Sequence, residues 1–233
     1  MATTIIKATG SVANPRFMSP PPPDVAVTPD QSWFATRSKM TPVDEDGYSA
    51  LEPVDGDTYP GFGLDDGNYY ARMNGSSDSL LIPAAGGESG EFSLAIVGKW
   101  RIEPTKNEVL FTAPGYTNFT VYLPANSTQL THFGNMMTIN RTKRNLFLYS
   151  YVKNTSGVYE RRLSVYGVGE MGTISTSSMA FAYPLRLGRN MGDTYGAGAT
   201  FDLQYVALWN RGMDATERNS VRASLAASFG ISA

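Results

Sequence analysis

The clearest hydrophobic pattern lies near the end of the chain, over residues 199–233. Between residues 201 and 209 every second residue is apolar, which predicts a β-strand with one packed face. By strict alternation, that face should hold Phe201, Leu203, Tyr205, Ala207 and Trp209. The strand therefore closes the fold with a strongly apolar surface.

A short helix is expected directly after this strand. Asp214 and Glu217 stand three residues apart, the spacing at which each side chain can satisfy a free backbone amide at a helix start. Val221 and Leu225 then define an apolar helix face, and Gly230 predicts where the helix ends.

Alternation of apolar and polar residues also runs through the middle of the chain. Residues 92–102 alternate without interruption, and further short strands are expected between residues 69 and 187, separated by turn signals such as Asn74-Gly75. About ten short strands, one terminal helix and no βαβ alternation predict an all-β fold, a two-sheet antiparallel sandwich.

The composition changes near residue 68. Residues 1–68 carry a net charge of −6 (four Lys and Arg, ten Asp and Glu) and nine of the fourteen prolines, whereas residues 69–233 carry +4. This shift predicts an extended, irregular N-terminal arm over 1–68 and a folded domain over 69–233. A flexible linker is the alternative, but the arm is rich in aromatic side chains that could anchor a partner. These are Trp33, Phe34, Tyr48, Tyr59 and Phe62.

Four stretches carry a family resemblance: Ala71-Arg-Met-Asn-Gly-Ser-Ser-Asp-Ser-Leu-Leu-Ile-Pro83, Phe92–Ile96, Leu185–Gly188 and Tyr205–Glu217. In this order they resemble the strands, Asn-Arg corner and capped helix of laminin-G-like, concanavalin A-like domains. The resemblance covers residues 69–233 and implies a jelly-roll sandwich. Such domains occur in bacteriophage virion proteins and in glycan-binding modules, so the fold alone leaves the function open.

Few residues offer catalytic or metal chemistry. The chain has no cysteine and a single histidine, His132, which leaves zinc sites and a Ser–His–acid arrangement without their usual members. Glycosidases need two facing carboxylates, and no spacing in the sequence predicts such a pair. Glu160 and Glu170, for example, each stand alone. We therefore predict a protein that is not an enzyme, with glycoside hydrolase as the least favoured alternative.

Cofactors, nucleic acids and membranes are not expected as partners. The Asp-Gly turns between residues 44 and 57 make bound calcium conceivable, but their spacing does not match an EF-hand loop. Basic residues are too scattered for nucleic-acid binding, and no apolar stretch approaches the roughly 18 residues of a membrane helix. The N-terminus lacks the pattern of a signal peptide.

Two functions remain. The first is a virion structural protein made in the host cytoplasm: a bacteriophage capsid decoration or tail-associated protein whose arm docks on other virion proteins or on copies of itself, giving a homo-oligomer. The alternative is a lectin-like adhesion module at a cell surface or outside the cell, which binds a cell-surface glycan through loop residues. The candidate loop residues are Tyr116, Asn190, Asp193 and Tyr195.

Overall fold

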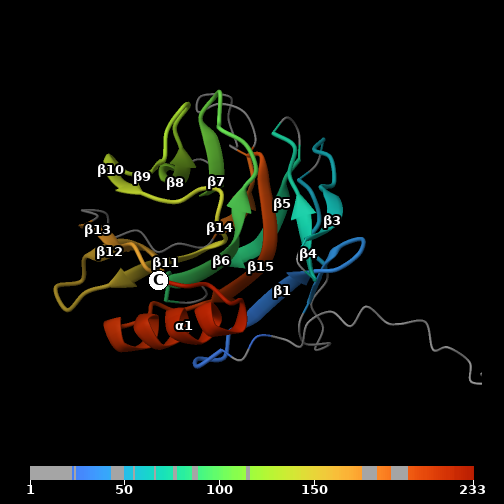
Figure 1. The fold of residues 1–233 in the computed structure, drawn as a ribbon. Coiled ribbons are helices and arrows are strands. Elements are labelled where there is room, and N and C mark those ends of the chain that lie inside the picture. The colour runs from blue at the N-terminus through green and yellow to red at the C-terminus, as the bar shows by residue number, and fades with distance from the viewer. Residues whose placement is uncertain are drawn as a thin grey trace, which may run out of the picture.

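The computed structural model describes residues 23, 25–42, 50–54, 56–65, 67–75, 78–85, 89–113, 116–174, 183–189 and 199–233. These residues form two antiparallel sheets and one helix, so the prediction of an all-β sandwich with a C-terminal helix is confirmed (Figure 1). No helix among them is long and apolar enough to cross a membrane.

The larger sheet has nine strands, in the order β13-β12-β11-β6-β15-β1-β2, with the β3–β4 hairpin also attached to β15. Its strands are β1 Gln31–Ala35, β2 Met40–Pro42, β3 Gly61–Asp65, β4 Asn68–Arg72, β6 Phe92–Trp100, β11 Asn145–Lys153, β12 Tyr159–Val165, β13 Gly169–Ile174 and β15 Phe201–Trp209.

The smaller sheet has six strands, in the order β10-β9-β8-β7-β14-β5. Its strands are β5 Leu80–Ala85, β7 Glu108–Ala113, β8 Tyr116–Leu123, β9 Gln129–His132, β10 Asn135–Thr138 and β14 Tyr183–Leu187. The helix, α1, spans Ala215–Ser228.

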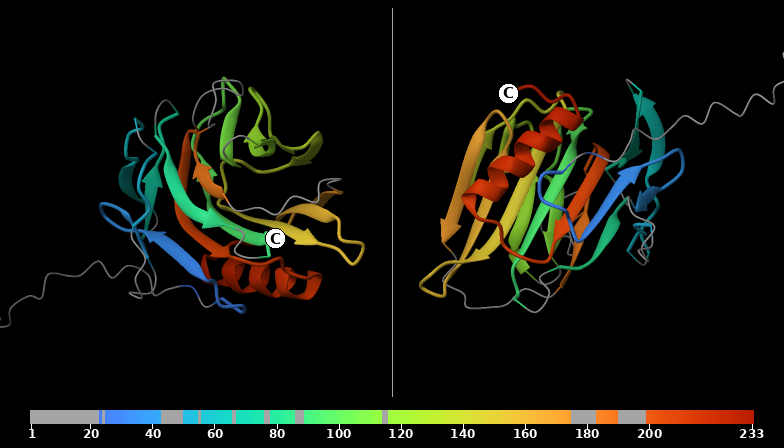
Figure 2. Two further views of the ribbon diagram at one scale, coloured as in Figure 1. Left: turned by 180° about the vertical axis from the view of Figure 1, so that it is seen from behind. Right: turned by 90° about the horizontal axis from the view of Figure 1, so that it is seen from below.

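The nine-stranded sheet is packed on both of its faces. One face meets the six-stranded sheet across the main core, which includes Trp33, Trp100 and Phe147. The other face is covered by α1, and Figure 2 shows the helix lying across it. Val221 and Leu225 of the helix pack there against Trp209.

A β-bulge changes which side chains of β15 face the core. Leu203 pairs with Gly98 of β6 and Tyr205 pairs with Val97, so Gln204 is an extra residue without a position opposite it. Leu203 consequently faces the main core, whereas Tyr205, like Ala207 and Trp209, faces α1. The expectation that residues 201–209 alternate strictly with one packed face is therefore wrong, because one inserted residue inverts the phase of the strand.

The described part of the expected arm is built into the same sheet. β1 pairs with β15 and β2 with β1, and Trp33 is fully buried in the main core. The β3–β4 hairpin crosses the boundary expected at residue 68. An irregular arm is thus corrected for residues 31–42 and 61–65, which form strands because β15, far along the chain, offers edges to β1 and β4, and these in turn pair with β2 and β3.

Both ends of α1 follow the sequence signals. Asp214 accepts a hydrogen bond from the Glu217 amide, and the Glu217 side chain accepts one from the Asp214 amide, which is the predicted capping box. Gly230 adopts a left-handed φ of 60°, and the amides of Gly230 and Ile231 donate to the carbonyls of Ala227 and Ala226. The helix therefore ends with Ser228 and Phe229 held in fixed positions.

Candidate functional site

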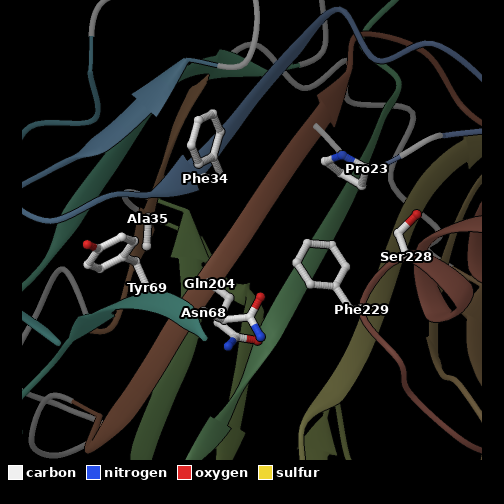
Figure 3. A pocket seen from close by; sticks show the side chains of 8 residues that line it. All are labelled: Pro23, Phe34, Ala35, Asn68, Tyr69, Gln204, Ser228 and Phe229. Carbon is white, nitrogen blue, oxygen red and sulfur yellow. The ribbon is translucent and has the colours of Figure 1, made fainter. Parts of the chain in front are cut away.

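A hollow opens on the outer face of the nine-stranded sheet, beside the end of α1 (Figure 3). About 30 Å³ of it can hold the centres of water-sized molecules, within about 430 Å³ of empty space that includes open solvent. The described residues that line it are Pro23, Phe34, Ala35, Asn68, Tyr69, Gln204, Ser228 and Phe229. Residues distant in the sequence thus meet at one concave surface, which is the usual form of a small-molecule site.

The hollow lies where one edge of β15 changes its partner. Residues 202 and 203 pair with β4, and residues 205–208 pair with β1. Gln204 stands between these two pairings and is also the bulged residue on the side of β6. A bulge re-aims a side chain at such a place, and here it directs Gln204 to the side that carries the hollow.

Three aromatic side chains surround two amides in this hollow. Phe34, Tyr69 and Phe229 are each half-buried, and Figure 3 shows the amide groups of Asn68 and Gln204 between the rings of Tyr69 and Phe229. The Phe229 ring is fixed by Tyr205, with centroids 5.4 Å apart. Aromatic faces offer flat apolar contact, while amides offer hydrogen bonds in defined directions.

Gln204 is the unusual member of this group. Its side chain is only 7% exposed, and its Oε1 has no hydrogen-bond partner among the described residues. A buried polar atom without a partner costs about 1–3 kcal/mol, which is recovered when a ligand supplies the missing donor. The hollow therefore contains a polar group that the described part of the fold leaves unsatisfied.

The residues predicted to anchor a partner lie in different places. Phe34 lines the hollow, but Trp33 is fully buried and is not available to a partner. Tyr59 and Phe62 pack against the main core, with ring centroids 5.7 Å apart, and the Tyr59 hydroxyl donates to the Leu51 carbonyl. Tyr48 lies outside the described residues.

The predicted glycan-contacting side chains lie outside the described part of the chain and stay a prediction. The backbone of Tyr116 begins β8, but its side chain is outside the description, as are Asn190, Asp193 and Tyr195. The sequence analysis missed Gln204, Asn68, Tyr69 and Phe229. The available signal was an amide within an otherwise strongly apolar strand, at residue 204.

The acidic turn that suggested calcium has a structural use. Asp57 is 4% exposed and accepts hydrogen bonds from Arg186, from Ser79 and, at 2.6 Å, from Arg189. Two cations thus occupy the carboxylate that a metal would need. No group of three or more metal-ligating side chains occurs within the described ranges. Residues 44–46 lie outside these ranges, so the expectation that no calcium is bound there stays a prediction.

Glu160 and Glu170, which each stand alone in the sequence, are held by one arginine. Arg162 donates to Glu160 at 2.6 Å and to Glu170 at 3.0 Å, and Arg218 also pairs with Glu170. The hydrogen bond from Arg162 lowers the pKa of Glu160. The pKa of Asp202 is instead raised by burial, and that carboxylate pairs with Arg101 at 3.0 Å and with Arg72 at 3.5 Å.

The single histidine lies between the two sheets. His132 is 1% exposed, its Nδ1 is 3.3 Å from the Thr120 carbonyl oxygen, and its ring meets the edge of Tyr149. Arg161 is nearby, with its guanidinium 4.7 Å from the rings of both Phe119 and Phe133. Burial, together with the charge of Arg161, lowers the pKa of His132 to about 4. His132 is thus a neutral packing residue at pH 7.

The fold is a two-sheet antiparallel β-sandwich, and solved structures share it. No protein-family model and no curated protein matches the chain. A Trypanosoma rangeli sialidase in complex with the inhibitor DANA matches with a TM-score of 0.54 and 10% identity over 82% of this chain. The same sialidase with sialic acid gives 0.53 and 11% over 83%. A botulinum neurotoxin serotype D/C binding domain gives 0.52 and 9% over 84%.

These matches cover only part of the compared proteins. The chain spans 32% of the sialidase chains and 51% of the toxin domain. At this identity the likeness shows the fold alone. The laminin-G-like resemblance is supported as far as a two-sheet β-sandwich, and the three structures give no support to a bacteriophage origin.

The comparisons also correct the prediction that the chain is not an enzyme. That prediction rested on carboxylate spacing, but the sialidase matches show that the fold occurs within glycoside hydrolase chains. Absence of a spacing motif is a weak argument in a sandwich, because residues from different strands come together, as Glu160 of β12 and Glu170 of β13 do through Arg162.

Proposed function

We propose that this chain is a carbohydrate-binding module that holds a sugar ring in the hollow between β1, β4, β15 and the end of α1. The observation that carries the proposal is the buried, unpartnered Oε1 of Gln204 among three aromatic rings. A sugar has apolar C–H faces that pack on aromatic rings and polar groups that donate hydrogen bonds, so it satisfies both features at once.

The fold supports the same proposal. The matched structures include a sialidase in complex with sialic acid and a toxin binding domain, both of which contain this type of sandwich. The cell-surface glycan expected from the sequence is therefore kept as the partner, but its contact residues are moved from the loops to the hollow. Virion location and self-association stay predictions.

The test is a titration of the full chain with a panel of free sugars, followed by calorimetry and by NMR shifts of the Gln204 side-chain amide. A single ring in such a hollow should bind with a Kd of about a millimolar, given ligand efficiencies near 0.3 kcal/mol per atom. Incubation with fluorogenic glycosides in parallel measures hydrolysis separately.

Two variants make the test specific. Gln204→Leu removes the acceptor at similar volume and should weaken binding about 10- to 100-fold, the effect of one buried hydrogen bond. Gln31→Leu is the matched control, because Gln31 Oε1 is also buried without a partner but lies at the other end of β1, outside the lining. Equal binding by the wild type and Gln204→Leu would refute the site.

The same pair of variants separates binding from folding. Removing an unsatisfied buried oxygen should leave the unfolding free energy unchanged or raise it by about 1 kcal/mol. A Gln204→Leu protein that is at least as stable as the wild type, yet does not bind, shows that Gln204 serves the ligand.

A further inference from the structure

The lining of the hollow is uncharged. All eight described residues that form it are apolar, aromatic, amide or hydroxyl residues. Of the nearby cations, Arg72 and Arg101 pair with Asp202, Lys99 pairs with Asp65, and Arg144 donates to the Phe229 carbonyl at 2.7 Å. A ligand carboxylate would lose its hydration without gaining a cation, which is costly in a partly buried site.

The buried oxygen of Gln204 sets a second condition. Oε1 is an acceptor, so the ligand must present a donor to it. A hydroxyl can donate, but it also brings lone pairs that need donors of their own in the same buried space. An amide N–H is a donor only, so it satisfies Oε1 without adding an unpaired acceptor at that point.

The rings set a third condition. Phe34, Tyr69 and Phe229 offer apolar contact on more than one side of the two amides. An acetamido group carries a methyl next to its N–H. The methyl can pack on a ring while the N–H donates to Gln204, with the carbonyl on the open side.

We infer that the hollow selects a neutral N-acetylated hexose and discriminates against acidic sugars. This inference rests on the proposed function and adds the class of sugar. It differs from the sialic acid present in one matched sialidase structure, because the selectivity follows from the lining of this chain.

The experiment is calorimetry of the full chain with five probes: N-acetylglucosamine, N-acetylgalactosamine, glucose, galactose and N-acetylneuraminic acid. At least one N-acetylhexose should bind about 10-fold or more tightly than its parent hexose, the effect of one good hydrogen bond plus a buried methyl. N-acetylneuraminic acid carries both an acetamido group and a carboxylate, and it should bind at least about 10-fold more weakly than that N-acetylhexose.

Two variants extend the test. Gln204→Leu should abolish the preference for the acetamido group. Ser228→Arg adds a cation at the exposed rim, in the last turn of α1 where a positive charge is tolerated, and should raise affinity for N-acetylneuraminic acid relative to the wild type.

The outcomes separate the inference from the proposed function. The inference is overturned when a parent hexose binds as tightly as its N-acetylhexose, or when N-acetylneuraminic acid binds as tightly as the N-acetylhexoses. Either result leaves a carbohydrate-binding module. Absence of binding to all five probes overturns both. Binding confined to N-acetylhexoses and lost in Gln204→Leu supports both.

Discussion

Acid should destabilise this protein through its single histidine. His132 is buried against Tyr149, and burial lowers its pKa to about 4, with the positive charge of Arg161 acting in the same direction. An exposed histidine in the unfolded chain has a pKa of about 6.5. The unfolded state therefore binds a proton first as the pH falls, which favours unfolding.

The size of this effect follows from the two pKa values. The contribution of His132 is complete above pH 6.5 and is lost progressively as the pH falls towards 4. A difference of about 2.5 units corresponds to about 3 kcal/mol in total, of which about 2 kcal/mol is lost by pH 5. Such a loss is a large fraction of the stability of an ordinary domain.

Urea unfolding between pH 8 and pH 4.5 measures the effect, with fluorescence of the three buried tryptophans as the signal. His132→Gln is the reference variant, because it keeps a donor for the Thr120 carbonyl and does not titrate. Carboxylates such as Glu160 and Asp202 contribute equally to both proteins and cancel in the difference. A wild-type minus variant difference that stays constant from pH 8 to pH 4.5 would refute the reasoning.

Three further changes test the fold. Asp57→Ala should cost about 3–5 kcal/mol in urea unfolding, because it leaves buried Arg186 without its carboxylate; a loss below 1 kcal/mol would contradict this. Asp214→Ala should cost about 1 kcal/mol by removing the helix cap, with less helical circular dichroism near the midpoint; an unchanged midpoint would argue against the cap. Gly98→Ala should cost about 1–3 kcal/mol, since its Cβ would meet the Asp202 carbonyl and the Phe201 ring, and a neutral result would mean that β6 and β15 can separate there.

The sequence predicts those parts of the fold that depend on local signals. The capping box at Asp214 and Glu217 and the glycine at 230 act within a few residues, so the helix was found with its ends. The bulge at Gln204 depends on how β15 pairs with β6, which no local pattern reports. The prediction of strict alternation over residues 201–209 is therefore wrong because Gln204 has no partner residue on β6.

The predictions of the N-terminal arm and of the site residues were wrong or incomplete for a related reason. Residues 31–35 form a strand because β15 offers them an edge, although their neighbourhood is rich in proline and aspartate. The hollow needs Phe34, Asn68, Gln204 and Phe229 from four separate segments, and apart from the amide at residue 204 each residue is ordinary in its own segment. Phe34 is predicted from the sequence as an anchoring aromatic of the expected arm, but its neighbours follow only from the fold.

The central place of β15 also constrains how the molecule can fold. Its edges hold β6 on one side and β4 and β1 on the other, so strands from the beginning and the middle of the chain pair through a strand near the far end (Figure 1). During synthesis β1 and β4 emerge from the ribosome long before β15, so the edges that pair with β15 stay unpaired until it is made. Pairings between such distant segments slow folding and leave time for association with other chains. Production at low temperature or with chaperones should therefore raise the yield of this protein more than stabilising mutations in its core.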